Sequence, residues 1–409
     1  MTASRFAKNC LFFLSLQGRD EFHCCFANCF FNIFIFCIRN YLNILMCKKH
    51  LYKIYILFFY FKMASSSSSS RDIGLDTLKA FGIISVLFWH LQPIQIYGED
   101  ILSIIIRMLV ITINYQLFLV AVPIFFVVSI YLFLKKANSD NRYSFKRLLN
   151  LFKLFAFWTG FHLIFYFITQ VAIFKTIEFE NLISSLDITK VLLGIQPSLP
   201  LAGDSVFYFL FNLIFLTALA FMYKQVAQRN RQILSIAIII IFTIYFEFLS
   251  IIGIYINYYR LDNFIVYIAI ADIFATTPKL LSRLKYLYLA IYICFSVQDI
   301  IFREMGMIMS IYARGSILYA SLVILSFIYP LNVGENLFIK KLAKYSLGIY
   351  AFHKYWQYLI IMFIIQIQSQ ISFIRYNTFI PLLVTFLVII TTAATIFILN
   401  KTPLKVFIC

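Results

Sequence analysis

The stretch RDIGLDTLKAFGIISVLFWH, residues 71–90, indicates that this chain forms helices inside a lipid bilayer. Its apolar residues extend over about 20 positions, the length of a membrane-spanning helix. Two ionisable groups, Lys79 and His90, stand within this run. Roughly three helical turns separate them, so both side chains lie on one face, about 16 Å apart along the axis. Because an ionisable group in hydrocarbon is costly and is usually kept for function, the stretch predicts a functional polar stripe.

A second segment of this kind, AKYSLGIYAFHKYWQYLI, covers residues 343–360. Ser346, Tyr350 and His353 follow an i, i+4, i+7 pattern and share one helix face. We therefore expect a second polar stripe that carries a histidine. A structural interpretation stays open for both rings: His90 as a residue at a helix end near the interface, and His353 as part of an aromatic belt.

The composition places the whole chain in the membrane class. Of 409 residues, 62% are hydrophobic and 13% are charged, and Phe alone contributes 48. So few charges cannot cover the surface of a soluble domain of this size. Because apolar stretches of spanning length recur, we predict an all-α integral membrane protein, a bundle of about ten transmembrane helices. The predicted spans are residues 73–92, 114–134, 148–173, 203–223, 232–250, 262–277, 286–302, 314–331, 345–366 and 378–399.

The net charge of +18 has two interpretations, nucleic-acid binding or membrane orientation. The basic residues cluster in alternate loops, as the positive-inside rule requires, and this favours orientation. We therefore expect both ends of the membrane core to be cytoplasmic, and no nucleic-acid partner. The cytoplasmic group holds Lys135, Lys136, Arg142, Lys146, Arg147, Lys224, Arg229, Arg231, Lys279, Arg283, Lys285, Lys340, Lys341 and Lys344. The opposite loops hold only scattered charges, such as Arg107, Lys175, Lys190, Arg260, Arg303, Arg314 and Arg375.

The N-terminal residues differ from the rest of the chain. Residues 1–62 hold six of the eight cysteines and lack clean periodicity, and residues 63–70 form a Ser-rich leader. We expect Met63 to be the native start, with an extra hydrophobic anchor as the alternative, and a membrane domain at 71–409. The cysteine spacing fits neither a metal site nor a disulfide framework, so we expect no metal.

Other polar residues fall inside or near the predicted spans. Glu247 and Asp272 are candidates for partners of a buried charge or for residues of a pathway. His162 has no aligned polar partner in its own helix, which favours a structural role. The chain carries no Walker loop, GxGxxG turn, GxSxG elbow or HExxH pair. This absence argues against ATP-driven transport, dinucleotide redox chemistry and zinc proteolysis within these residues.

Residues 71–400 resemble the multi-pass acyltransferases of family 3, which O-acylate glycans at bacterial surfaces. The first signature is the leading helix, where Asp76, Lys79 and His90 match the family's Asp, basic residue, ten intervening residues and His. The closest match is YSLGIYAFH at 345–353. Three further segments are similar to family motifs: VAVPIFFVVSIYLFLKK (120–136), with Pro123, Phe125, Phe126, Ser129 and Tyr131; FKRLLNLFKLFAFW (145–158); and GDSVFYFLFNLIF (203–215).

The chain also departs from the family pattern. The family usually has Arg where Lys79 stands, and Lys keeps the charge but loses the bidentate fork. The Gly that follows the motif serine is Ile130, and Phe207 replaces a tryptophan. A second Arg expected near Asn150 and a Pro expected near Lys153 are absent. These departures leave open a weakly active enzyme or a different donor or acceptor.

The resemblance implies an O-acetyltransferase of the bacterial inner membrane. It would move an acyl group from cytoplasmic acetyl-CoA to a hydroxyl of a surface glycan or its lipid-linked precursor. The resemblance implies that His90 is the general base or a transient acyl carrier, and that His353 is a second base or orients the hydroxyl. The remaining predicted site residues face the donor (Lys79, Arg142, Lys146, Arg147, with Asp76 holding Lys79) or line the channel (Ser129, Ser346, Tyr350).

Two other functions stay open at this stage. A transporter or flippase for glycan precursors fits the helices and intramembrane ionisable groups equally well, although we see no inverted repeat. A non-catalytic subunit that binds polysaccharide assembly proteins would explain the departures from the motifs. The lipid bilayer is a partner in each case.

Overall fold

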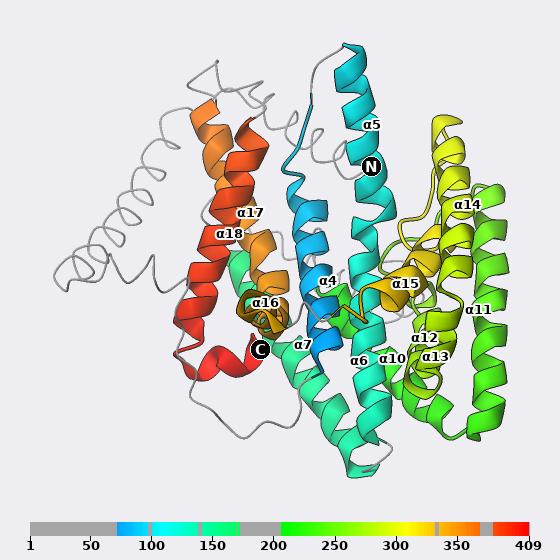
Figure 1. The fold of residues 1–409 in the computed structure, drawn as a ribbon. Helices are drawn as coiled ribbons and strands as arrows, with labels where there is room; N and C mark the ends of the chain where they lie inside the picture. The colour runs from blue at the N-terminus through cyan, green and yellow to red at the C-terminus, as the bar shows by residue number, and fades with distance from the viewer. Residues whose placement is uncertain are drawn as a thin grey trace. The chain divides into compact units, whose positions relative to one another are not determined.

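The computed structural model describes residues 72–96, 100–137, 141–169, 171, 206–331, 335–368 and 379–408. Within these ranges every regular element is a helix (Figure 1). The predicted leader segments 1–62 and 63–70 lie outside the described residues.

Each stretch predicted as a span overlaps a helix of the structure. Six runs are long and apolar enough to cross a membrane; they lie in α4, in α5 to α6, and in α7, α11, α14 and α18. The protein is thus an all-α membrane protein in its described part, while the count of ten crossings stays a prediction. The long and medium helices are α4 (Ile73–Leu91), α5 (Ile101–Gln116), α6 (Ala121–Ala137), α7 (Asn141–Thr169), α10 (Tyr208–Lys224), α11 (Gln228–Ile251), α12 (Val266–Thr276), α14 (Lys285–Glu304), α15 (Gly315–Phe327), α17 (Ser346–Gln368) and α18 (Phe379–Leu399). The short elements are η1 (Phe118–Val120), η3 (Leu261–Asn263), α13 (Pro278–Arg283), α16 (Leu337–Lys344) and η6 (Pro403–Phe407).

The helix that leads into the second predicted span begins earlier than we expected. We placed the start of this span at residue 114, with Arg107 in a preceding loop, but α5 begins at Ile101 and contains Arg107. Asp100 caps this helix: its carboxylate accepts bonds from the hydroxyl and the backbone N–H of Ser103, at 2.6 and 3.0 Å. These two bonds hold the pKa of the Asp100 carboxyl below its usual range. The cap therefore stabilises the first turn of a helix that begins at Ile101, before the predicted span.

Two predicted spans contain helices of only half the spanning length. α12 has 11 residues and α15 has 13, so each is shorter than about 20 Å at 1.5 Å per residue. A bilayer core is about 30 Å thick, and neither helix crosses it alone. Both are enclosed by protein, because residues 266–274 are all buried and most of α15 is buried too. The backbone N–H and C=O groups at the ends of these two helices can therefore bond to polar groups of neighbouring helices.

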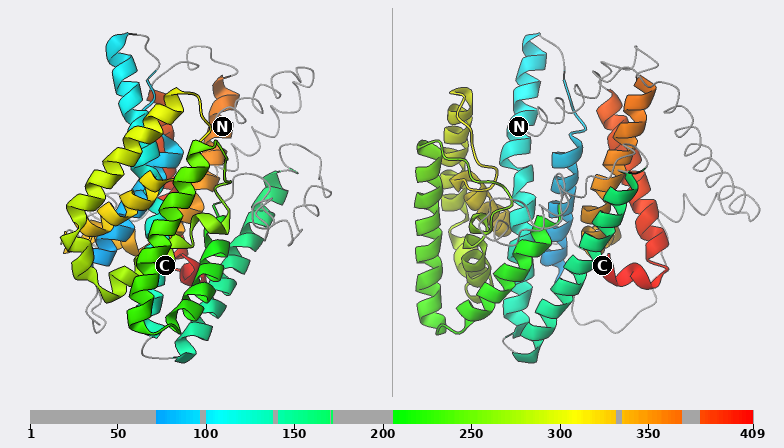
Figure 2. Two further views of the ribbon diagram at one scale, coloured as in Figure 1. Left: turned by 90° about the vertical axis from the view of Figure 1, so that its right-hand side faces the viewer. Right: turned by 180° about the vertical axis from the view of Figure 1, so that it is seen from behind.

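The helix α4 lies at the centre of the packing. It contacts α6 on one side and α17 on the other, and α16 packs across it (Figures 1 and 2). α14 pairs with α15, and α17 pairs with α18. Close approach of α4 to its neighbours depends on Gly74, which lies directly against Tyr329, and on Gly82, which lies under the ring of Phe125. The central position of α4 brings its C-terminal histidine next to α17.

Candidate functional site

The structure brings His90 and His353 together. His90 lies in the last turn of α4, and His353 lies in α17. The centroids of the two imidazole rings are 5.2 Å apart, and the ring planes are inclined by 37°. His353 is fully buried, and His90 is partly buried. Two helices that are far apart in the sequence thus supply one pair of adjacent, tilted rings.

The hydrogen bond of His353 defines its tautomer. Its Nδ1 lies 3.0 Å from the carbonyl oxygen of Ile349, one turn earlier in the same helix. A carbonyl only accepts, so Nδ1 carries the proton and donates it to this bond. The Nε2 atom of His353 is buried and has no hydrogen-bond partner among the described residues. In the neutral ring this atom holds a lone pair that can accept a proton.

His90 is fixed through its backbone. The amide nitrogen of Gln357 donates a 2.7 Å hydrogen bond to the carbonyl oxygen of His90. Gln357 follows His353 by one turn of α17, so the same helix face supplies the second ring and this bond. Just beyond His90, Gln92 ends α4 in a left-handed conformation (φ 43°, ψ 61°), and its N–H bonds to Phe88. The sequence analysis missed Gln357, although its i+4 spacing from His353 was a usable signal.

The other residues of the α17 stripe have separate partners. Tyr350 is buried with its ring centroid 6.2 Å from that of His353, and its hydroxyl donates a 2.7 Å bond to the carbonyl of Val206. The hydroxyl of Ser346 instead bonds to the carbonyl of Ala343 at 3.1 Å, just before α17. Tyr350 thus borders the histidine pair, whereas Ser346 makes a local contact at the start of the helix.

The residues predicted to face the donor lie on α4 and α7. Asp76 is buried and Lys79 is partly buried, one turn apart in α4. On α7, Arg142 and Lys146 are exposed and Arg147 is partly buried. Ser129, predicted to line the channel, is partly buried on α6. None of these six residues lines the pocket described next.

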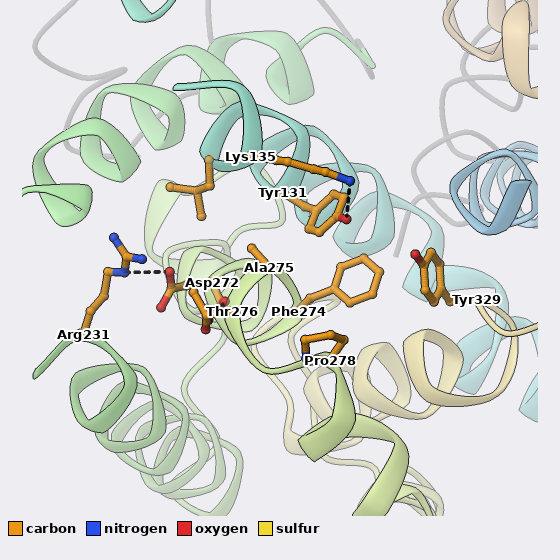
Figure 3. Close-up of a pocket in the computed structure, with 10 residues that line it drawn as sticks. Tyr131, Lys135, Arg231, Asp272, Phe274, Ala275, Thr276, Pro278 and Tyr329 are labelled. Atoms are coloured by element: carbon orange, nitrogen blue, oxygen red, sulfur yellow. Dashed lines mark hydrogen bonds and ion pairs between the residues drawn. The ribbon is translucent and has the colours of Figure 1, made fainter. Parts of the chain in front are cut away.

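A polar pocket of about 220 Å³ lies between α6, α11 and α12 (Figure 3). It is separate from the histidine pair, since neither histidine lines it. The ten lining residues are Tyr131, Leu134, Lys135, Arg231, Asp272, Phe274, Ala275, Thr276, Pro278 and Tyr329. Its walls combine aromatic rings with one exposed ammonium group and one ion pair.

The ion pair of this pocket joins α11 to α12. The Nε atom of Arg231 lies 2.8 Å from Oδ1 of Asp272, and the hydroxyl of Ser235 donates to Oδ2 at 3.1 Å. Both charged residues are buried. We predicted Arg231 as a loop residue that only sets orientation, and this was incomplete: it pairs with an acid inside the protein. Asp272, a candidate for such pairing, has its partner here.

A second buried ion pair joins α14 to the start of α15. Nη1 of Arg314 lies 3.0 Å from Oδ2 of Asp299, and each side chain is only 3% exposed. The same oxygen accepts bonds from the amide of Gln116 and from the hydroxyl of Ser316. Nearby, Glu247 accepts a 2.9 Å bond from the backbone N–H of Gly315. The sequence analysis missed Asp299 and took Arg314 for a scattered loop charge.

The third membrane histidine has a different environment. Nδ1 of His162 lies 3.1 Å from the hydroxyl of Tyr355, which comes from α17. A pattern within one helix could not reveal this partner, because it belongs to another helix. The ring centroid of His162 lies 5.9 Å from that of Tyr355, with the planes tilted by 43°, and 6.2 Å from that of Phe207, edge to face.

Comparison with known proteins identifies the family of the chain. A family model described as an acyltransferase domain, that of acyltransferase family 3, matches residues 72–400. The match contains His90, His162 and His353 and the two buried ion pairs described above. No curated protein and no solved structure matches the chain. Since the family model covers well over half of the sequence, this multi-pass membrane protein belongs to acyltransferase family 3.

Proposed function

We propose that this protein is a membrane O-acyltransferase, with acetyl as the transferred group. The donor is acyl-CoA from the cytoplasm, and the acceptor is a hydroxyl of a surface glycan or of its lipid-linked precursor. The observation that carries the proposal is the 5.2 Å approach of the His90 and His353 rings within a family of acyltransferases. The host membrane is the bacterial inner membrane, with the basic loops in the cytoplasm.

The chemistry requires removal of one proton. The acceptor hydroxyl attacks the thioester carbonyl, a C–O bond forms, and the C–S bond breaks to release CoA. Nε2 of His353 takes the hydroxyl proton and returns it to the departing thiolate, so that the ring is neutral again at the end. We assign the base to His353 rather than to His90, because the bond from Nδ1 to Ile349 leaves Nε2 with the lone pair. The adjacent His90 ring then orients the hydroxyl.

The other predicted residues have supporting roles in this proposal. Tyr350, next to His353, borders the acceptor side of the rings. Lys79 with Asp76, and the cations Arg142, Lys146 and Arg147 on α7, attract the anionic donor from the cytoplasm. Ser129 and Ser346 border the path between donor and acceptor. A multi-pass fold allows the two substrates to arrive from opposite faces of the membrane.

The test measures the ester content of the host's surface polymer. Cells that carry His90→Ala or His353→Ala are compared with wild type and with His162→Ala, which serves as the matched control. We expect loss of surface acylation for the first two variants and retention for the control, with equal membrane levels of all proteins. Unchanged acylation in the His353→Ala variant would remove this ring from the reaction.

A second measurement separates transfer from transport. Purified protein is incubated with radiolabelled acetyl-CoA and a glycan extract, and we expect labelled glycan together with released CoA. Movement of glycan into vesicles without any consumption of thioester would favour the transporter instead.

A further inference from the structure

The segment that follows α18 packs against two helices of the histidine site. It forms the short turn η6, which Thr402 caps, and it lies beyond residue 400, where the family match ends. Figure 1 shows it as the red segment that turns away from the end of α18. Its side chains differ sharply in exposure: Val406 is 68% exposed, whereas Phe407 is partly buried and Ile408 is 1% exposed. The last two side chains are therefore held against the protein.

Phe407 joins this segment to α7. Its ring stacks on that of Phe157, with the centroids 3.9 Å apart and the planes inclined by 9°. The Nε1 atom of Trp158 donates a 3.2 Å hydrogen bond to the backbone carbonyl of Phe407. Trp158 is fully buried and meets the ring of Phe352 edge to face, at 5.1 Å and 74°. Because Phe352 directly precedes His353 in α17, the contacts of Phe407 extend to the residue beside the imidazole.

Ile408 contacts the first turn of α17 directly. The backbone N–H of Gly348 donates a 3.2 Å hydrogen bond to the carbonyl oxygen of Ile408. Gly348 lies in the first turn of α17, where an N–H group has no acceptor within its own helix. The residue is also buried, and a buried N–H group needs a partner. The carbonyl of Ile408 thus does for α17 what a capping side chain does elsewhere.

The close approach of Ile408 also accounts for the glycine at position 348. A Cβ there would lie 3.0 Å from the Cβ of Ile408 and 3.1 Å from its carbonyl oxygen. Both distances are shorter than ordinary van der Waals contact, so an alanine would push the segment away. The next residue, Ile349, provides the carbonyl that holds Nδ1 of His353 at 3.0 Å. The segment therefore contacts α17 immediately before the residue that orients the ring.

From these contacts we propose that Phe407 and Ile408 are positioning residues for His353. They fix α17 at two points, Gly348 before the ring and Phe352 beside it, and so hold Nε2 at the place that proton transfer needs. A displacement of a reacting group by about 1 Å can cost about 10²-fold in rate. The inference rests on the proposed function, in which His353 is the base.

The first test compares two neighbouring residues of the segment. Acyl-transfer kinetics are measured for the full-length protein in lipid nanodiscs. For Phe407→Ala we expect kcat to fall about tenfold, with an unchanged KM for the donor, because the substitution displaces the base and leaves the donor site intact. Val406→Ala is the matched control, since this side chain points away from the protein, and it should keep the wild-type kcat.

Two features of this assay separate positioning from stability. The assay is run well below the lowest melting temperature, where nearly all molecules are folded, so a contact that only stabilises the fold leaves kcat unchanged. Phe407→Tyr keeps the ring that stacks on Phe157, and it should restore kcat. Wild-type kcat in Phe407→Ala under these conditions would overturn the proposal.

A second test combines two substitutions. Gly348→Ala presses on Ile408 from the opposite side of the same contact, so it should also lower kcat. If both substitutions act by displacing one segment, the double variant Gly348→Ala/Phe407→Ala should be no slower than the slower single variant. Losses that multiply in the double variant would mean that the two residues act by separate routes, against the proposal.

A third measurement needs no acyl transfer. Hydrogen exchange is followed by mass spectrometry for peptides that cover residues 343–352, in nanodiscs. Since the bond to Ile408 protects the N–H of Gly348, we expect about tenfold faster exchange in Phe407→Ala than in Val406→Ala. If wild type transfers acyl groups and both variants match it in exchange and in kcat, the positioning assignment is wrong. If wild type transfers none, the proposed function fails, and the exchange rates alone decide whether the segment holds α17.

Discussion

The side-chain amide of Gln357 donates a hydrogen bond to the backbone carbonyl of His90, with the two atoms 2.7 Å apart. This bond links α17 to the last turn of α4 at the level of the two imidazole rings. The geometry of the histidine pair therefore depends on a residue that is not itself ionisable.

Gln357 is expected to act as a positioning residue. Gln357→Ala removes one hydrogen bond, worth about 1 kcal/mol, and should lower kcat about fivefold. Gln357→Glu has the same shape but, when ionised, no N–H to donate, so we expect a loss at least as large. Acyl-transfer kinetics in nanodiscs measure both. Wild-type kcat in the Glu variant would mean that the side chain only fills space.

His353 is expected to contribute general-base catalysis. Replacement by Ala should lower kcat about 10² to 10⁴-fold, the usual contribution of a positioned base. KM for the donor should change little, because the proposed role of the ring is to take a proton rather than to bind the donor. Steady-state kinetics of purified protein provide the measurement. His162→Ala, which loses only the contact with Tyr355, should retain turnover.

Removal of one partner of the Asp299–Arg314 ion pair is expected to destabilise the fold strongly. Asp299→Ala leaves a buried guanidinium without its carboxylate and should cost about 3–5 kcal/mol. The control is Asp262→Ala, whose ion pair with Arg260 is partly exposed and should contribute less than about 1 kcal/mol. Thermal unfolding in one detergent compares the two. Equal melting temperatures for both variants would contradict the assigned burial.

Gly74 is expected to tolerate no side chain. A Cβ at this position would lie 2.5 Å from the carbonyl oxygen of Tyr329, a backbone atom that cannot turn away. Gly74→Ala should therefore destabilise the protein by about 1–3 kcal/mol. At Gly160, in α7, a Cβ meets nothing within 4 Å, so Gly160→Ala should be neutral or stabilising by about 0.5–1 kcal/mol. Melting temperatures of the two variants should thus move in opposite directions or differ by several degrees.

Much of the fold could be predicted because hydropathy and helix periodicity are local. The phase of Lys79 and His90 on α4, and of Tyr350 and His353 on α17, follows from 3.6 residues per turn alone. The presence of a helix at each apolar stretch follows from the number of residues that a helix needs to cross the hydrocarbon core. The start of α5 was missed although residues 101–113 are mostly apolar, because Arg107 was counted as a loop charge.

The contacts between helices could not be predicted from local patterns. Arg231 and Arg314 look like ordinary loop cations in the sequence, and only the packing of α11 on α12 and of α15 on α14 shows their buried partners. The pocket wall is assembled in the same way, from three helices and the turn that holds Tyr329. A charge counted for orientation can therefore also be part of a buried network.

The half-length helix α12 has a consequence for biogenesis. The helix α12 has 11 residues and contains the carboxylate of Asp272. It is therefore too short and too polar to insert into lipid on its own. Asp272 becomes neutralised only when α11 presents Arg231, which is synthesised earlier. We therefore expect α11 and α12 to enter the bilayer together rather than one after the other.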